Sequence, residues 1–103
     1  MNYCMILTTC STEADAGNLA SALVKKKLAA CAQIHQVTSV YTWEGEVHND
    51  PEFRLIIKTK AALYKKAEAF IRAHHNYEVP QIVMVPIEDG LSEYLNWIDE
   101  TTG

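Results

Sequence analysis

The feature that most constrains the fold is a long hairpin pattern in the middle of the chain. Residues 31–47, CAQIHQVTSVYTWEGEV, are rich in β-branched and aromatic residues up to Trp43, and Glu44-Gly45 then suits a tight turn. The return strand, PEFRLIIKTK (51–60), has the same character. A strand of about 13 residues extends about 43 Å, at roughly 3.3 Å per residue, which is too long for one small sheet. We therefore expect part of the hairpin to project from the domain and to need a partner.

The segments around the hairpin predict two more strands and three helices. YCMILTT (3–9) has the length and composition of a strand, and Asn49-Asp50-Pro51 predicts an edge or a bulge in the return strand. Thr12 with Asp15 is a plausible helix N-cap, and Gly17 weakens the helix that follows. The apolar face of that helix comprises Leu19, Leu23, Val24 and Leu28.

The second half of the chain contains the clearest helical pattern. AALYKKAEAFIRAHH (61–75) predicts a helix that ends near Asn76, and VPQIVMVPI (79–87) predicts a buried strand between two prolines. Leu91, Tyr94, Leu95 and Ile98 predict a short closing helix. The apolar face of the 61–75 helix comprises Leu63, Ala67, Phe70, Ile71 and His74.

This order of elements predicts a single α+β domain over residues 1–103. The order is β-α-β-β-α-β plus a C-terminal helix, which is the ferredoxin-like split βαβ pattern. Right-handed connections then place both main helices on one face of a four-stranded antiparallel sheet. The opposite face has little cover within the chain, so we expect an oligomer.

Composition excludes several classes of function. The net charge is −4, and the only lysine cluster, residues 25–27, complements a helix C-terminus, so we expect no nucleic-acid binding. No segment approaches the ~20 apolar residues of a membrane span, and no basic leader precedes the first apolar run. Three cysteines without a CxxC pair argue against a disulfide framework or structural zinc, and indicate a reducing cytoplasm.

Several motifs resemble one known family, the CutA divalent-cation-tolerance proteins. They occur in family order and with family spacing: KKKLAACAQI (25–34), SVYTWEGEV (39–47), LIIKTK (55–60), HHNYEVPQI (74–82) and YLNWI (94–98). The resemblance implies a ferredoxin-like fold in a tight homotrimer, with hairpins that reach neighbouring subunits and an architecture similar to the PII signalling proteins. It also implies a connection with tolerance of copper and other divalent metals, and in a mammalian relative with acetylcholinesterase anchoring.

The resemblance implies a copper site whose ligands are a cysteine at the end of the first strand and two paired histidines. The histidines match His74 and His75, whereas the cysteine position falls on Thr8 and this chain offers Cys10 two residues later. Alternate strand residues share a face but lie ~7 Å apart, which metal bonds of about 2.0–2.3 Å do not bridge. Imidazole and thiolate ligands suit copper and zinc, so the candidate metal ligands are His74, His75 and Cys10.

A purely structural interpretation of the two histidines also fits the sequence. Neighbours on a helix diverge by about 100°, so His74 belongs to the apolar face while His75 turns aside. His74 then closes the core, and His75 lies near the negative end of the helix dipole. Both interpretations stay open at this point.

A second group of family-like residues predicts a ligand cleft between subunits. Its candidate residues are Trp43, Glu52, Lys58, Tyr77 and Glu78, which either pack as ordinary hairpin and loop residues or bind a small anion or metabolite. No Ser-His-Asp or Cys-His arrangement and no glycine-rich phosphate loop supports catalysis, so we expect a non-enzyme. Two hypotheses follow: a cytoplasmic trimer that binds copper or another divalent cation in metal tolerance, or a PII-like signalling or scaffolding trimer that binds a small ligand.

Overall fold

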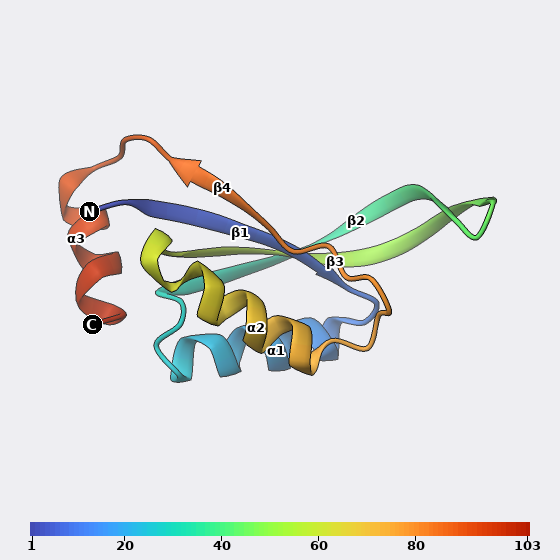
Figure 1. The fold of residues 1–103 in the computed structure, drawn as a ribbon, viewed down its shortest axis with the longest axis horizontal. Coiled ribbons are helices and arrows are strands. Elements are labelled where there is room, and N and C mark those ends of the chain that lie inside the picture. The colour runs from blue at the N-terminus through green and yellow to red at the C-terminus, as the bar shows by residue number, and fades with distance from the viewer.

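The sheet and two helices form two layers. The computed structural model describes all residues 1–103, and its four antiparallel strands lie in the order β2-β3-β1-β4. Helices α1 and α2 cover one face of the sheet, and α3 lies at the end of the molecule near both termini (Figure 1). The ferredoxin-like α+β prediction is confirmed. The elements are β1 (Tyr3–Cys10), α1 (Glu13–Lys25), β2 (Cys31–Trp43), β3 (Glu46–Lys60), a 3-10 turn (Ala61–Leu63), α2 (Tyr64–His74), β4 (Val83–Ile87) and α3 (Ser92–Thr101).

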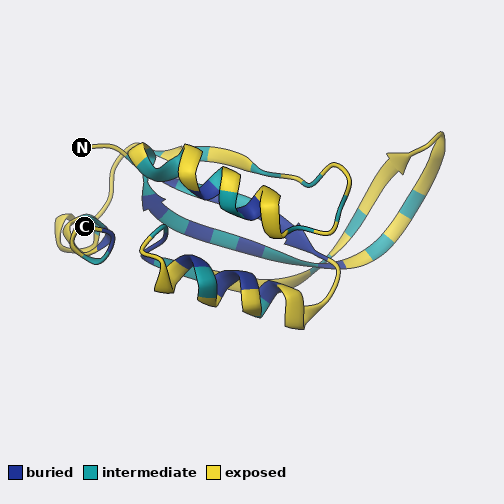
Figure 2. Cartoon of the chain, turned by 60° about the horizontal axis from the view of Figure 1, so that its bottom comes forward, coloured by how far each residue is buried: buried dark blue, intermediate teal, exposed yellow.

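The core lies between the central strands and the two helices. Strand β1 buries alternate residues, and β3 buries its own alternate set on the same face, as the two-residue period of a strand requires. Figure 2 shows this buried layer between the sheet and the helices. Each fully buried Leu or Ile contributes about 1.5–3 kcal/mol to folding. The residues of this layer include Cys4, Ile6, Thr8, Cys10, Leu23, Leu55, Ile57, Thr59, Ala67 and Ile71.

Strands β2 and β3 pair without interruption along a long hairpin. Their register runs from Cys31 opposite Lys58 to Trp43 opposite Glu46. Glu44 and Gly45 form the turn with φ values of 52° and 81°, as a type I′ turn requires. Strand β1 ends opposite Phe53. Residues 37–52, here called the ribbon, therefore project with no third strand beside them (Figure 1), which confirms the projecting hairpin.

The proline of the return strand fits this geometry. Pro51 lies opposite Thr38 and belongs to the ribbon, where β3 has a neighbour on one side only. The missing amide of a proline is tolerated where one edge of a strand is open. The predicted edge position is confirmed. Because the register is unbroken, the alternative prediction of a bulge is wrong.

Helix α1 begins as expected but ends earlier than its apolar pattern indicates. The Asp15 amide donates to Thr12 Oγ1 at 3.1 Å, which confirms the N-cap. At the other end Lys27 has φ of 60°, and the Leu28 amide donates to the Leu23 carbonyl at 3.0 Å, as in a Schellman motif. Val24 lies within α1 but outside its buried row of Ala16, Leu19, Ala20 and Leu23. It is 41% exposed, so its assignment to the apolar face was wrong.

Two boundaries in the second half of the chain also differ from the prediction. Helix α2 ends at His74, and His75 has an extended backbone with φ of −95° and ψ of 140°. Strand β4 begins at Val83 rather than at residue 79. It is not buried, because it is an edge strand beside β1 alone: Val83 is 43% exposed and Met84 is 41% exposed.

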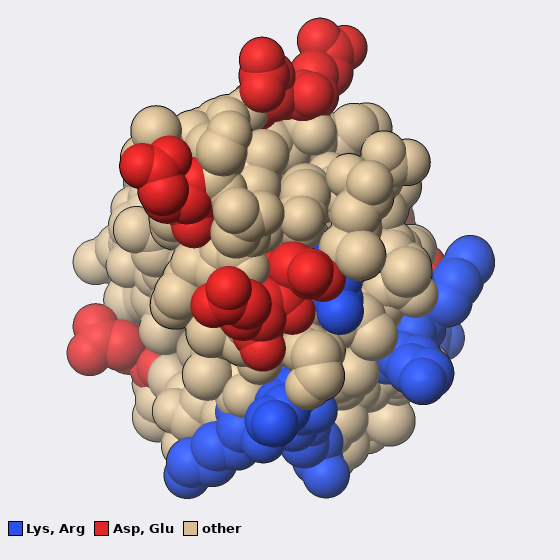
Figure 3. Space-filling view, turned by 90° about the vertical axis from the view of Figure 1, so that its left-hand side faces the viewer, with Lys and Arg blue, Asp and Glu red and all other residues tan.

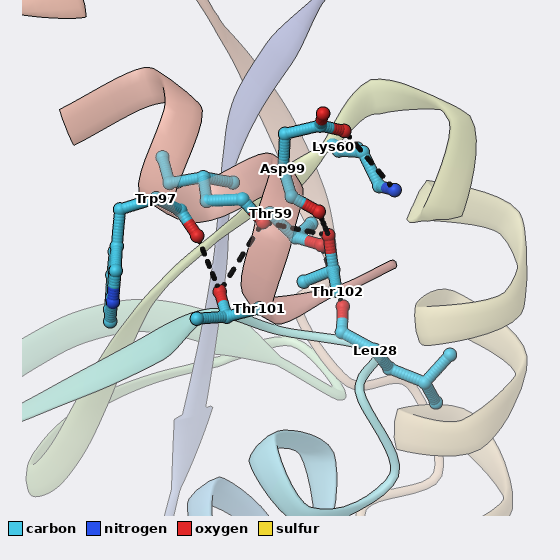
Figure 4. Close-up of polar contacts among 8 residues, drawn as sticks. Leu28, Thr59, Lys60, Trp97, Asp99, Thr101 and Thr102 are labelled. Carbon is cyan, nitrogen blue, oxygen red and sulfur yellow. Dashed lines mark hydrogen bonds and ion pairs between the residues drawn. The ribbon is translucent and has the colours of Figure 1, made fainter. Parts of the chain in front are cut away.

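Helix α3 docks on the end of β3. Ile98 is fully buried, and the Lys60 ammonium lies 3.5 Å from the Asp99 carboxylate, while the Thr102 hydroxyl donates to the Ile98 carbonyl (Figure 4). The helix carries acidic residues and no Lys or Arg. Seen from this end, acidic side chains occupy the upper and central surface, and basic ones the lower and right margins (Figure 3). No helix of the structure combines the length and apolarity that a membrane crossing needs.

Candidate functional site

The three predicted metal ligands line one cavity between α1 and the end of α2. This helix cavity has a volume of about 300 Å³, and Cys10, His74 and His75 all contribute to its wall. Cys10 arrives from the end of β1, while the histidines come from the end of α2 and the residue after it. Asp15 of α1 adds a carboxylate to the same wall. The structure therefore brings together residues that are separated by more than sixty positions in the chain.

Both ring nitrogens of His75 already have partners in the chain. The Tyr77 amide donates to His75 Nδ1 at 3.1 Å, so the ring proton is on Nε2, which donates to the Thr9 carbonyl at 2.6 Å. The ring thus joins the start of the loop after α2 to the end of β1. The expectation that His75 turns aside was wrong, because its extended backbone directs the side chain back toward the sheet.

His74 offers the one uncommitted imidazole nitrogen of the cavity. Its Nδ1 lies 2.8 Å from the Phe70 carbonyl, so it donates there and leaves Nε2 with a free lone pair. The ring stacks on Phe70 with centroids 4.1 Å apart but is exposed. His74 therefore continues the apolar face only through this stack and does not close the core.

Cys10 is a buried thiol rather than a preformed thiolate. Burial, with the nearby carboxylates of Asp15 and Glu52, raises its pKa to about 11. Thr8, at the cysteine position that the resemblance implies, is fully buried and its hydroxyl has no hydrogen-bond partner. Thr8 does not line the helix cavity.

The donor set in one chain does not make a closed metal site. The structure contains no group of three or more His, Cys, Asp or Glu side chains placed to hold one ion. One imidazole is fully hydrogen-bonded and the thiol is protonated at neutral pH, so His74 Nε2 is the donor available without rearrangement. A cation at this cavity would meet one nitrogen donor, with other ligands from rearrangement, solvent or another chain.

A second cavity lies between the ribbon and the loop after α2. This ribbon cleft has a volume of about 640 Å³ and is lined by residues from 39–43, by Glu52 and by residues from 76–81. Four of the five predicted cleft residues meet here: Trp43, Glu52, Tyr77 and Glu78. The structure thus gathers them within one subunit.

Lys58, the fifth predicted cleft residue, lies elsewhere. It is six residues along β3 from Glu52, about 20 Å in an extended strand. Its ammonium donates to Gln33 Oε1 at 2.7 Å and lies 5.9 Å from the ring centroid of Tyr94 in α3. Within one subunit Lys58 therefore lies outside the ribbon cleft, because strand position separates the two groups. Its place in a cleft between subunits stays a prediction.

A short hydrogen bond organises the floor of the ribbon cleft. The Tyr77 hydroxyl donates to Glu52 Oε2 at 2.7 Å, and Glu52 is only 9% exposed. Burial, together with the Glu52 carboxylate, raises the pKa of Tyr77, so the phenol stays protonated. Because Glu52 lies at the base of the ribbon, this bond joins β3 to the loop after α2.

Sequence reasoning missed one aromatic residue of the cleft. Tyr41 lines it beside Trp43, and its hydroxyl donates to Asp50 Oδ2 at 2.7 Å. The two-residue period of a strand places residues 41 and 43 on one face, and that signal was present in the sequence. Asp15 and Asn18 of the helix cavity were also missed, and only the packing of α1 against β1 brings them there.

Comparison with known proteins decides the family. The family model described as the CutA1 divalent ion tolerance protein matches residues 4–101. The chain belongs to the CutA family. It is 43% identical to the divalent-cation tolerance protein CutA of Thermus thermophilus over 100 residues, covering 96% of this chain and 97% of that protein. It is 40% identical to human protein CutA over 91% of this chain, but this match spans only 53% of the human protein.

Solved structures of the CutA family have the same fold. The CutA structure from Archaeoglobus fulgidus, described as a periplasmic divalent cation tolerance protein, superimposes with a TM-score of 0.96 at 38% identity, covering 98% of this chain and 99% of that one. The Thermus thermophilus structure gives 0.93 at 42% identity over 98% and 99% of the two chains. The resemblance seen in the sequence is confirmed, and with it membership of a divalent-cation tolerance family.

Proposed function

We propose that this protein contributes to divalent-cation tolerance as a cytoplasmic homotrimer that binds the cation directly, with copper as its preferred ion. The observation that carries this proposal is the free Nε2 of His74 on a cavity that Cys10 and His75 also line. Imidazole nitrogen and cysteine sulfur are ligands that suit copper. Its role is binding rather than catalysis.

The trimer is supported by the open face of the sheet. Alternation along the strands places Met5, Leu7, Ile56, Val83 and Val85 on the face that α1 and α2 do not cover. Tyr94 and Trp97 of α3 add a stacked, exposed aromatic pair. An apolar face of this kind marks an interaction surface. The cytoplasmic location is supported by three free cysteines, which suit a reducing compartment.

Calorimetric titration with Cu(II) tests the metal proposal. Wild type, His74→Ala, His75→Ala and the double variant are compared, and His48→Ala on the ribbon is the matched control. We expect His74→Ala to weaken binding by about tenfold, the effect of losing roughly 1.4 kcal/mol of binding free energy. An isotherm of the double variant that matches wild type would remove both histidines from the metal site.

A second candidate function is supported by the ribbon cleft. In this case the protein is a PII-like signalling or scaffolding trimer, and the cleft, which holds four of the predicted residues, binds a small ligand. A volume of about 640 Å³ suits a metabolite. A thermal-shift screen tests it, because a ligand at 100 times its dissociation constant stabilises the folded state by about 2.7 kcal/mol. A set of metabolites that leaves the melting temperature unchanged would count against this candidate.

A further inference from the structure

The charged side chains that line the ribbon cleft are all negative. Its lining includes the carboxylates of Glu52 and Glu78, and no Lys, Arg or His. The absence of Lys58 from the cleft removes the one positive group that would have favoured an anion. A cleft with this lining attracts positive charge.

Glu52 lacks the partner that a buried carboxylate ordinarily has. It is 9% exposed and forms no ion pair; the ion pairs of the chain are Lys60 with Asp99 and Lys65 with Glu68. Its one hydrogen bond comes from the Tyr77 hydroxyl, a neutral group. Carboxylates are almost never fully buried unless they are paired, because removing the charge from water is costly. A positively charged ligand would supply the charged partner that Glu52 lacks within the chain.

Aromatic side chains decide which kind of cation fits. Tyr41 is 42% exposed and Trp43 is 39% exposed, and both line the cleft with Tyr77. Aromatic faces attract organic ammonium groups, and Trp is the strongest of these partners. A hard metal ion would instead require six or more oxygen ligands, whereas the cleft buries one carboxylate. Alkyl groups on the cation also match the apolar walls formed by Val40 and Val79.

We propose that the ribbon cleft binds a small organic ammonium ion, with its charged nitrogen at the Glu52 carboxylate and its alkyl groups against Trp43 and Tyr41. This inference rests on the second candidate function, the small-ligand cleft, and names its ligand class. It does not depend on metal binding at the helix cavity, which lies beyond the loop after α2.

Three probes of nearly equal shape test the inference on the full chain. They are choline, its uncharged carbon isostere 3,3-dimethylbutan-1-ol, and the anion 3,3-dimethylbutanoate, each titrated by calorimetry. We expect choline to bind at least about tenfold more tightly than the other two, because only choline gains the ion pair and the cation–π contact.

Matched variants locate the binding. Glu52→Gln keeps the size of the side chain and should weaken choline binding about tenfold, while Glu93→Gln on exposed α3 should leave it unchanged. Trp43→Leu provides a second test at a partly exposed position, where truncation leaves the core intact, and should also weaken choline binding. Circular dichroism confirms that each variant is folded.

The outcomes distinguish failure of the ammonium proposal from failure of the small-ligand function on which it rests. Equal binding of all three probes, or tighter binding of the anion, would overturn the ammonium proposal and leave a ligand cleft in place. Failure of all three probes to bind would overturn the ammonium proposal alone, because the thermal-shift set of metabolites tests the small-ligand function separately. If choline fails to bind while Glu52→Gln changes the sedimentation of the protein, a basic side chain of a second copy occupies the cleft, and the ammonium proposal is overturned.

Discussion

At the scale of single residues, Thr8 carries an unmet hydrogen-bonding requirement. Its hydroxyl is fully buried without a partner, although the side chain packs in the middle of β1. We expect Thr8→Val, which keeps the shape and removes the hydroxyl, to raise the free energy of unfolding by about 1 kcal/mol. Urea unfolding at fixed protein concentration measures it.

Thr59 provides the matched control for that substitution. It is equally buried on β3, but its hydroxyl donates to the Leu28 carbonyl at 2.7 Å. Thr59→Val should therefore lower the free energy of unfolding by about 1 kcal/mol, because it leaves that carbonyl without its donor. Equal destabilisation by both substitutions would show that the Thr8 hydroxyl has a partner after all.

The thiol of Cys10 predicts a loss of stability in alkaline solution. Its pKa rises from an ordinary value of 9.0 to about 11 in the folded state, chiefly through burial. The folded state therefore favours the protonated thiol; this stabilisation is complete below pH 9 and is lost as the pH rises through about 11. We expect the free energy of unfolding to fall more steeply over this interval in wild type than in Cys10→Ala. Parallel curves from chemical unfolding at a series of pH values would contradict the assignment.

The histidine pair illustrates what residue-level reasoning from sequence can and cannot supply. The sequence names His74, His75 and Cys10 as candidate metal ligands, and all three line the helix cavity. It cannot predict that the Thr9 carbonyl and the Tyr77 amide engage both nitrogens of His75, since that depends on where the helix ends and on contacts 66 residues apart. The available donor of the pair was therefore visible only in the structure.

At the scale of elements, substitution of glycine by alanine should have opposite effects at two positions. One is Gly17 in α1, and the other is Gly45 in the hairpin turn. Gly17 is helical, and an added Cβ meets nothing within 4 Å, so Gly17→Ala should stabilise the protein by about 0.5–1 kcal/mol. Gly45 has φ of 81°, which alanine adopts only with strain, so Gly45→Ala should destabilise it by about 1 kcal/mol. Thermal unfolding of both variants against wild type measures the difference. Changes of the same sign would contradict this account.

Elements with local causes were predictable, and those with distant causes were not. The N-cap at Thr12 and the turn at Gly45 follow from neighbouring residues, and the sequence predicts both. The end of α1 depends on a left-handed lysine, Lys27, where glycine is usual, and no composition rule marks it. The exposure of β4 depends on its position at the sheet edge, which the apolar run alone does not reveal.

At the scale of the whole molecule, the open face of the sheet predicts which substitution disrupts the proposed trimer. Val83 lies on that face opposite Leu7, whereas Met84 lies on the other face of the same strand with similar exposure, 41% against 43%. We expect Val83→Glu to shift the sedimenting species from a trimer to a single 11.6 kDa chain, because a buried unpaired carboxylate is costly at an apolar contact. Met84→Glu is the control and should leave the trimer intact.

Analytical ultracentrifugation at micromolar concentration decides the outcome. A wild-type protein that sediments as a stable folded monomer would contradict the trimer itself. A Val83→Glu protein that remains trimeric would show that the sheet face is not the contact. The fold of the subunit and the open face of its sheet were both predictable from the order of elements, whereas the residues on that face, such as Val83, follow only from the strand register.

The uninterrupted pairing of β2 with β3 limits how a hairpin of this design can change in length. Deleting or adding one residue in a single arm would exchange inward and outward side chains along everything beyond it, and would separate Trp43 from Glu52. A matched change, with one residue added to or deleted from each arm next to the tip, preserves the direction of every side chain between the tip and the rest of the sheet. Viable length variants of this hairpin should therefore differ by even numbers of residues.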